Sequence, residues 1–457
     1  MHRLVYRIAL VLDQLMNATT KQIAQLRFKW HEASALLNAD GQPERTAAIP
    51  KPDTTTHIVG GVHFIKDVNC ESTLQAVRQA LCQGVEFCVH SESVSTLIAN
   101  RREHSFNTEE QSYLQCLSSG SNGKPKRIRR TQSSWINSFL VTKEQDDISS
   151  ADSYAIIGRA SHSLALYAAL EAAWIGADVH ALADLRPNKQ LRAIAHLKSS
   201  VLYATPTQLR LLCSSVKPAV EKNTQLRYLF CGGGKLDEFT ASLVANHFPN
   251  ATVKEFYGAS ETSFITMGDN TTPIDSVGKL YPQVQMKIMP VDSDTHSTDH
   301  LDNGCVGEIW IKSPYLFEQY CDGIEPDTRW YNGFLCIGEM GYIDDQANLY
   351  LTGRRSRMVN IADNMVFPEQ IENLLNNHEA VRHCVVIATN DSKRGSVLIA
   401  VVEAVETQQL RAQLLKYCRE ELGALKAPRD ITFVDSLPIL ASGKPDLQSV
   451  ERQYDPT

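Results

Sequence analysis

Short apolar segments alternate with longer segments of helical length and composition through the middle of the chain. The apolar segments have the length and composition of buried strands, and they lie at 153–158, 179–183, 201–205, 227–231 and 252–256. Between them, segments such as 164–174 and 189–198 have the length and composition of helices. Strands that alternate with helices predict an α/β fold, with a largely parallel sheet covered by helices.

The pattern differs at the two ends of the chain. Residues 1–37 have a helical pattern. From about 270 to 353, short β segments separated by turns such as Asp302–Gly304 predict a small β-rich subdomain. Beyond it, helices at 368–377 and 406–422 are expected to bracket a pair of strands, as in a small α+β domain.

These patterns predict a large N-terminal domain and a small C-terminal one. We expect the first, with parallel-type sheets flanked by helices, to span 1–354, a hinge to lie at 355–357, and a mobile α+β cap to span 358–457. A length of 457 residues agrees with two or three domains.

Composition narrows the class of protein. A net charge of -7 argues against nucleic acid as the main partner. Eleven cysteines without a C-x-x-C pair indicate reduced thiols in a cytoplasmic protein. The chain has no run of about 18 apolar residues, so we expect no integral membrane contact.

A small-residue, basic loop is expected directly after the apolar segment 113–117. It contains Ser118, Ser119, Gly120, Ser121, Asn122, Gly123 and Lys126. Glycines allow tight turns, hydroxyl and N–H groups supply donors, and lysine supplies positive charge, so the loop suits phosphate oxygens. Arg127, Arg129 and Arg130 are expected to add positive charge around these donors. The spacing differs from that of a P-loop, and a solvated surface loop also explains the composition.

Two further small-residue segments, Gly232–Gly234 and Tyr257–Thr262, follow predicted strands. Ligands of α/β sheets bind at the carboxyl ends of the strands, where all three segments are expected to lie. Glu261 is a carboxylate beside hydroxyl groups, which suits a Mg²⁺ ion that phosphates and water also hold. A polar turn is the alternative interpretation.

Three charged residues stand in turns farther along the chain. Glu339, between Gly338 and Gly341, could accept both hydroxyls of a ribose, although a tight hairpin also explains it. Arg354 could bind a ribose or a carboxylate as a bidentate donor, or belong to a solvated hinge. Lys444, on a Ser-Gly turn, could reach into a site on another domain or be an exposed tail residue.

Together these motifs resemble one family, the adenylate-forming superfamily of AMP-binding enzymes, which includes acyl-CoA synthetases, aryl-acid ligases and adenylation domains. The resemblance runs from about 113 to 448 and depends on the order of the motifs. They are Ser118–Lys126, Thr205–Thr207, Gly232–Gly234, Tyr257–Thr262, Ser276–Gly278, Gly307–Glu308, Gly338–Glu339, Gly353–Arg354, Pro368 with Glu372, and Ser442–Lys444.

The resemblance implies an AMP-forming acid–thiol ligase that uses ATP and Mg²⁺. A carboxylic acid would react with ATP to give an acyl-adenylate and pyrophosphate. The thiol of CoA, or the phosphopantetheine of an acyl carrier protein, would then take the acyl group. An aryl or fatty acid is favoured over an amino acid, because the sequence shows no acidic anchor for an amino group.

The resemblance also implies roles for particular residues. The loop Ser118–Lys126 would hold the β- and γ-phosphates, and Glu261 would hold Mg²⁺. Glu339 and Arg354 would hold the ribose. The residues expected to flank adenine are Gly232, Gly233, Gly234, Glu255, Phe256, Tyr257, Gly258, Ala259 and Ser260.

Further roles concern the reacting groups and the hinge. Lys444 would bridge the substrate carboxylate and the ribose or α-phosphate, and Glu261 and Thr262 complete the expected catalytic set. The expected acid-binding residues are Gly232, Gly258 and His162. His162 could equally cap a helix. Ser356 would lie at the hinge.

The chain departs from the family pattern at several positions. Glu339 and Ser356 stand where Asp, and Asp or Lys, are usual, and Asn122 stands where Thr or Ser is usual. Asp363 stands where Gly is common beside the pantetheine tunnel, and a carboxylate there would narrow the tunnel or repel an anionic thiol donor. Glu339 and Asp363 support an alternative, a non-catalytic or adenylate-only homologue that acts as a scaffold in a biosynthetic complex.

Overall fold

The computed structural model describes residues 36–37, 56–59, 61–91, 112–118, 126–215, 222–269, 271–273, 275–291, 301–323, 325–361, 364–391, 395–439 and 445–454. The described residues form two compact units. The first contains those up to 118, from 126 to 285 and from 312 to 323, and the second contains those from 286 to 311 and from 325 onward.

The first unit contains an eight-stranded sheet in the order β1-β8-β7-β9-β10-β11-β12-β13. All neighbours from β1 to β11 are parallel, and the last two pairs are antiparallel. The predicted α/β fold is confirmed. The strands are β1 (Leu36–Leu37), β7 (Ser153–Ile156), β8 (Asp178–Ala181), β9 (Val201–Ala204), β10 (Tyr228–Gly232), β11 (Thr252–Ala259), β12 (Ser263–Gly268) and β13 (Lys279–Leu280).

A second sheet of the same unit has six strands in the order β16-β6-β5-β4-β3-β2. Its last strand in the sequence, β16, pairs antiparallel with β6 although the two are far apart in the chain. The sequence analysis did not predict β6. The strands are β2 (Thr56–Val59), β3 (Val62–Lys66), β4 (Glu86–His90), β5 (Tyr113–Ser118), β6 (Lys126–Thr131) and β16 (Gln319–Tyr320).

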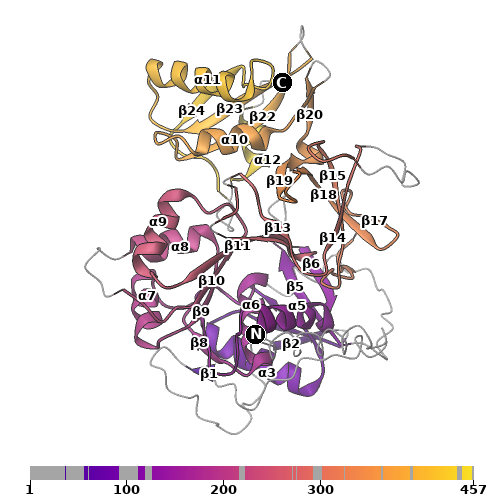
Figure 1. The fold of residues 1–457 in the computed structure, drawn as a ribbon, viewed down its shortest axis with the longest axis vertical. Coiled ribbons are helices and arrows are strands. Elements are labelled where there is room, and N and C mark those ends of the chain that lie inside the picture. The colour runs from indigo at the N-terminus through magenta and orange to yellow at the C-terminus, as the bar shows by residue number, and fades with distance from the viewer. Residues whose placement is uncertain are drawn as a thin grey trace. The chain divides into compact units, whose positions relative to one another are not determined.

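Helices cover both faces of the eight-stranded sheet, because alternate side chains of its strands point to opposite faces. Leu202 and Leu229 pack in a core with α7, α8 and α9, whereas Tyr203 packs against Tyr167 of α6. Figure 1 shows α7, α8 and α9 on one side of these strands and α6 on the other. α6 also contacts β5 of the second sheet. The helices are α3 (Cys70–Gln83), α5 (Gln132–Gln145), α6 (Ser163–Ile175), α7 (Pro187–His196), α8 (Pro206–Ser214) and α9 (Glu238–His247).

The second unit begins with an antiparallel β-rich part in which β18 pairs with β15, β17 and β19. Within the predicted β-rich region, β18 is a long strand of 10 residues. The elements are β14 (Gln285–Met289), β15 (Gly307–Lys312), β17 (Arg329–Tyr331), β18 (Phe334–Ile343), β19 (Leu349–Arg354), η1 (Arg355–Arg357), β20 (Val359–Ile361) and β21 (Asn364–Val366).

The C-terminal part of this unit is a three-stranded sheet, β22-β23-β24, with helices packed around it. The predicted strand pair is present as β22 and β23, while β24 and α12 were not predicted. The elements are α10 (Pro368–Asn376), β22 (His383–Asp391), β23 (Gly395–Glu403), α11 (Gln408–Leu422), β24 (Asp430–Val434) and α12 (Leu447–Tyr454).

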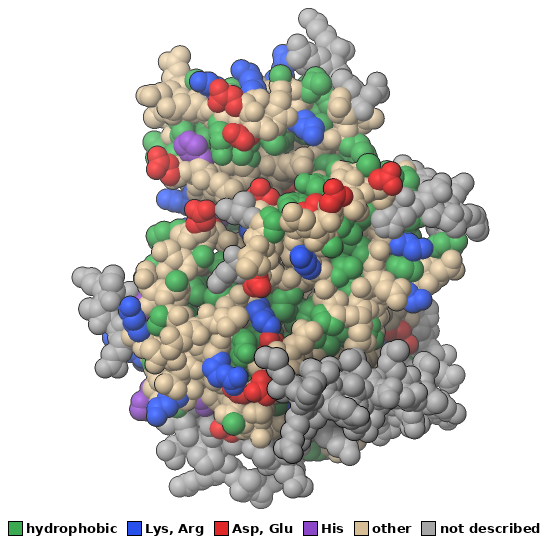
Figure 2. All heavy atoms as spheres, viewed as in Figure 1, with side chains coloured by type: hydrophobic (Ala, Val, Ile, Leu, Met, Phe, Trp, Pro, Cys, Tyr) green, Lys and Arg blue, Asp and Glu red, His purple; other side chains and the backbone are tan. Residues whose placement is uncertain are grey.

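Two expectations about the chain as a whole can be compared with the structure. The helical interpretation of 1–37 is wrong at Leu36–Leu37, which form β1, and residues 1–35 lie outside the described residues. In the part of the chain that the structure describes, no helix is long and apolar enough to cross a membrane. Figure 2 shows acidic and basic side chains interspersed on the face that it draws.

Candidate active site

Strands β5 and β6 position the predicted phosphate loop. Ser118, the last residue of β5, is the register partner of Lys126, the first residue of β6. The loop between them therefore leaves and enters neighbouring antiparallel strands. Its residues Ser119, Gly120, Ser121, Asn122 and Gly123 lie outside the described residues, so their phosphate-binding role stays a prediction.

The three arginines that follow Lys126 do not surround the loop with positive charge, so this expectation was wrong. Arg127, Arg129 and Arg130 are 4%, 2% and 0% exposed. Arg127 forms an ion pair with Asp322, and Arg129 forms one with Glu86 at 3.1 Å. The charges of Arg127 and Arg129 are therefore engaged by carboxylates inside the unit.

Lys126 and Glu261 are connected through one aromatic residue, Tyr320 of β16. The Lys126 Nζ atom lies 5.9 Å from the centroid of the Tyr320 ring. The Tyr320 hydroxyl donates a hydrogen bond to Glu261 Oε1 at 2.8 Å. The two residues that the sequence analysis assigned to phosphate and Mg²⁺ are therefore close in space. Tyr320 was missed, because its place depends on the pairing of β16 with β6, which no local pattern reveals.

Glu261 stands in a tight turn between β11 and β12. The backbone bends at an irregularity after Tyr257, and a Cβ atom at Gly258 would lie 1.8 Å from the Ser263 carbonyl oxygen. The Ala259 N–H donates to Thr262 Oγ1 at 3.0 Å. Gly258 and the buried Thr262 therefore give the turn its shape, and the expected catalytic role of Thr262 stays a prediction.

The three glycines that begin at the last residue of β10 do not leave an open space at Gly232. A Cβ atom there would lie 2.2 Å from the ring of Phe256, its register partner on β11. A glycine is therefore required at this position, because a side chain would collide with the Phe256 ring. The same ring fills the space that was expected for the substrate beside Gly232. Gly233 has a φ of +86°, which favours glycine, and Gly234 continues the same turn.

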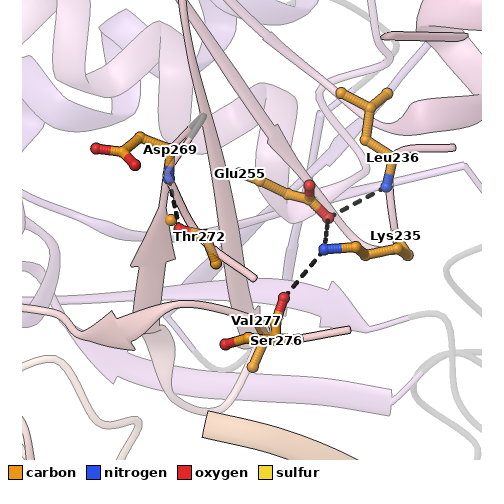
Figure 3. Close-up of a pocket in the computed structure, with 8 residues that line it drawn as sticks. Lys235, Leu236, Glu255, Asp269, Thr272, Ser276 and Val277 are labelled. Atoms are coloured by element: carbon orange, nitrogen blue, oxygen red, sulfur yellow. Dashed lines mark hydrogen bonds and ion pairs between the residues drawn. The ribbon is translucent and has the colours of Figure 1, made fainter. Parts of the chain in front are cut away.

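A polar pocket of about 170 Å³ is lined by residues that follow β10, by Glu255 in the middle of β11 and by the segment at the end of β12 (Figure 3). One wall is Glu255, which accepts a hydrogen bond from the Leu236 N–H at 3.1 Å and pairs with Lys235 Nζ at 3.5 Å. Lys235 also donates to the Ser276 carbonyl oxygen at 3.0 Å. Cavities of about 150 Å³ can hold a single aromatic ring, so this pocket has room for one.

Glu339 and Arg354 of the second unit form a direct ion pair. They are register partners on β18 and β19, and Arg354 Nη2 donates to Glu339 Oε1 at 2.6 Å. Gly338 has a φ of +78°, and a Cβ atom there would lie 2.8 Å from Asp327 Cβ. The structure brings together the two residues expected to hold the ribose.

Ser356 lies in the middle of the 3₁₀ helix η1. Arg355 Nε is 3.1 Å from Glu308 on β15, and Arg357 Nη2 is 2.7 Å from Glu372 on α10. The residue expected at the hinge therefore has a fixed ion pair on each side. Lys444 and Asp363 lie outside the described residues, and their roles stay predictions.

His162 is the exposed N-cap residue of α6, and its side chain makes no capping hydrogen bond. Its backbone forms a bridge to Leu117 at the end of β5, which places it near the start of the predicted phosphate loop. The next residue, Ser163, lies 3.0 Å from Ser260 through their Oγ atoms.

The described side chains include no cluster of three or more residues that could hold a metal ion. A Mg²⁺ that phosphates and water mostly hold needs few protein ligands. Glu261 fits this requirement, because the hydrogen bond from Tyr320 engages Oε1, and Oε2 has no hydrogen-bond partner within the described ranges.

Comparison with known proteins decides the family. The family model of AMP-binding enzymes matches residues 19–321, and the model of their C-terminal domain matches residues 370–444. This chain belongs to the AMP-binding enzyme family. The predicted family is confirmed, while the domain boundaries stay predictions.

Relatives of this AMP-binding enzyme are named acyl-CoA ligases. It is 30% identical over 341 residues to an uncharacterized acyl-CoA ligase of Bacillus subtilis (strain 168), covering 73% of this chain and 67% of the relative. It is 29% identical over 380 residues to a provisionally named long chain fatty acid-CoA ligase of Staphylococcus haemolyticus, covering 80% and 78%. These names agree with the predicted class, an AMP-forming acid–thiol ligase.

A solved structure shows the same fold. The o-succinylbenzoate CoA synthetase of Bacillus subtilis, in complex with its acyl-adenylate intermediate, matches with a TM-score of 0.67 at 21% identity, over 85% of this chain and 83% of that chain. That synthetase was also solved with ATP and a magnesium ion.

Proposed function

We propose that this AMP-binding enzyme activates a carboxylic acid with ATP and transfers the acyl group to a thiol. The observation that carries the proposal is the group Lys126–Tyr320–Glu261, in which the lysine expected at the triphosphate and the carboxylate expected at Mg²⁺ share one aromatic neighbour. The names of its relatives, which are CoA ligases, support CoA as the acceptor.

The proposed chemistry has two steps. A carboxylate oxygen of the acid attacks the α-phosphorus of ATP, so that a P–O bond forms, the bond to the β-phosphate bridging oxygen breaks, and pyrophosphate leaves. The sulfur of the thiol, which gives up its proton, then attacks the acyl carbon, and AMP leaves. Neither step needs a protein nucleophile, because placement and charge neutralisation lower the barriers.

The residues of this chain would place the reactants and neutralise their charge. Lys126 and the predicted loop would hold the terminal phosphates, and Glu261 would hold Mg²⁺, which when bound neutralises charge on the leaving pyrophosphate. Arg354, held by Glu339, would present N–H donors to the ribose. Lys444 would draw the substrate carboxylate toward the α-phosphate.

The pocket beside Glu255, which has room for a single aromatic ring, supports a place for the amino-bearing six-membered ring of adenine. It lies beside the predicted adenine segment, and its carboxylate can accept a hydrogen bond from an exocyclic amino group. For the acid we propose an aryl or fatty acid, and for the acceptor CoA in preference to a carrier protein.

Pyrophosphate release with a panel of acids tests the proposal. The full-length protein is incubated with ATP, Mg²⁺, hydroxylamine as a trap, and aliphatic, aryl and amino acids. We expect release with one class of acid and its loss in Glu261→Gln. Glu238→Gln, which changes an exposed carboxylate on α9, should leave the rate unchanged.

The same assay separates the alternative function. Tight ATP binding by calorimetry without pyrophosphate release from any acid would contradict catalysis and favour a nucleotide-binding scaffold. Once an acid is known, parallel reactions with CoA and with a phosphopantetheine-loaded carrier protein identify the acceptor.

A further inference from the structure

Arg130 on β6 differs from the other buried arginines of its strand. Arg127 and Arg129 each form ion pairs. Arg130 is 0% exposed, yet within the described ranges no carboxylate lies at ion-pair distance from it. Its Nε atom has no hydrogen-bond partner. A buried cation without a carboxylate partner is costly, so its presence calls for a specific explanation.

The guanidinium group of Arg130 is directed at the turn that carries Glu261. Nη1 donates to Ser263 Oγ at 2.6 Å, and Nη2 donates to the Ser260 carbonyl oxygen at 3.0 Å. Nη2 also approaches the Tyr315 carbonyl oxygen at 3.4 Å. The contacted positions lie on both sides of Glu261. Arg130 thus connects β6 to the two ends of a short turn through a rigid planar group.

The turn itself needs such a support. Ser263 has a φ of +55°, in the left-handed region that is unfavourable for a residue with a side chain. Its hydroxyl donates to the Tyr315 carbonyl oxygen at 3.2 Å while accepting from Arg130. These bonds hold Ser263 in this conformation, because a change of its backbone would break both.

The ring of Trp135 offsets part of the energetic cost of burying the charge of Arg130. The guanidinium carbon of Arg130 lies 5.0 Å from the centroid of the Trp135 ring, within the range of a cation–π contact. Burial lowers the pKa of Arg130, and the nearby Glu261 carboxylate opposes this by favouring the charged form. The positive charge is therefore retained close to Glu261 without a direct ion pair that would occupy the carboxylate.

We propose that Arg130 is a positioning residue, which fixes the Ser260–Ser263 turn so that Glu261 is presented to Mg²⁺ and the triphosphate. This inference rests on the proposed function, because it assumes that Glu261 serves the metal. If so, loss of the guanidinium group should change the dependence of the reaction rate on Mg²⁺ concentration more than it changes the affinity for ATP without Mg²⁺.

The test compares Arg130→Lys with Arg127→Lys. Lysine keeps the positive charge but cannot supply the planar fork. Arg127 is a matched control, since it is buried on the same strand and its ion-pair partner is Asp322, outside the turn. For each variant, pyrophosphate release is measured over a range of Mg²⁺ concentrations, and ATP binding is measured by calorimetry with EDTA.

For Arg130→Lys we expect kcat to fall about tenfold or more, because small misplacements of reacting groups cost up to about 100-fold. The Mg²⁺ concentration for half-maximal rate should rise severalfold, while ATP binding in EDTA stays unchanged. Arg127→Lys should melt at a lower temperature with the Mg²⁺ dependence of the wild type. Equal Mg²⁺ dependence in the two variants would overturn the inference.

Two further measurements decide the remaining cases. If Arg130→Lys does not fold, Ser263→Ala is measured instead, because this substitution removes the hydroxyl that Arg130 contacts. Unchanged Mg²⁺ dependence of Ser263→Ala would overturn the inference. If the wild type releases no pyrophosphate with any acid, the proposed function fails by itself. Arg130 is then judged by calorimetry: the gain in ATP affinity on adding Mg²⁺ should be lost in Arg130→Lys, and its retention would contradict the inference.

Discussion

Glu171 is a buried carboxylate that should make this enzyme less stable as the pH rises. It lies on α6 and is 0% exposed. The hydroxyls of Tyr154, Tyr167 and Tyr203 donate hydrogen bonds to it over 3.2, 3.4 and 2.7 Å. Burial disfavours the charged form more than these bonds favour it, and raises the pKa of Glu171 from 4.5 to about 7.

The magnitude follows from the two pKa values. Between them the folded protein keeps a proton that the unfolded chain has released, so the contribution of Glu171 to stability is complete below the lower pKa and is lost as the pH rises through the upper one. One pKa unit corresponds to about 1.4 kcal/mol, which gives a total loss of about 3 kcal/mol. About 2 kcal/mol of this falls between pH 5.5 and pH 8.5.

Glu171→Gln removes the titration while keeping the shape. Its amide oxygen can still accept from Tyr154 and Tyr203, and its NH₂ group can donate to Tyr167. The Tyr167 hydroxyl can turn its own proton to Ser138 Oγ, which lies 2.8 Å away. We therefore expect the variant to fold and to lose the dependence on pH that Glu171 causes.

Urea melts at pH 5.5 and pH 8.5 measure this effect as a difference between proteins, so that other titrating groups cancel. The free energy of unfolding of Glu171→Gln should rise by about 2 kcal/mol relative to the wild type between the two pH values. Glu238→Gln on α9 should show no such change. A gap between wild type and Glu171→Gln that is equal at both pH values would refute the reasoning.

Three further predictions concern the candidate site. In Gly258→Ala the new Cβ atom would collide with the Ser263 carbonyl oxygen, so the turn must shift and kcat should fall about 100-fold in the pyrophosphate assay; a wild-type rate would contradict the tight turn. Glu339→Gln should raise the KM for ATP severalfold by releasing Arg354, and should lower the melting temperature, because the Glu339 side chain is only 13% exposed and the ion pair is partly shielded from water. Lys444→Ala should reduce pyrophosphate release about 100-fold while calorimetry shows unchanged ATP binding, and weakened binding would instead indicate a role at the nucleotide.

Much of the fold could be predicted because the sequence patterns that indicate its strands and helices are local. Strands β7 to β11 are short apolar segments between helices, and their alternation indicates parallel pairing directly. The family resemblance assigned Glu339 and Arg354 to one ribose, but their direct ion pair depends on the pairing of β18 with β19. The glycines were less informative about the site. At Gly232 the missing side chain makes room for the Phe256 ring and not for a ligand, because the register of β10 and β11 places the two residues opposite each other.

Strand β6 shows why the rest of the site could not be predicted. Four of the residues in Lys126–Thr131 are basic, a pattern typical of an exposed, solvated segment. Inside the sheet each arginine instead finds a distant partner: Asp322 for Arg127, and the turn around Glu261 for Arg130. Such pairs join segments that lie far apart in the chain, and local periodicity does not indicate which segments meet. Arg130 therefore serves the candidate site by holding the turn that carries Glu261, whereas Arg127 joins β6 to Asp322, outside that turn.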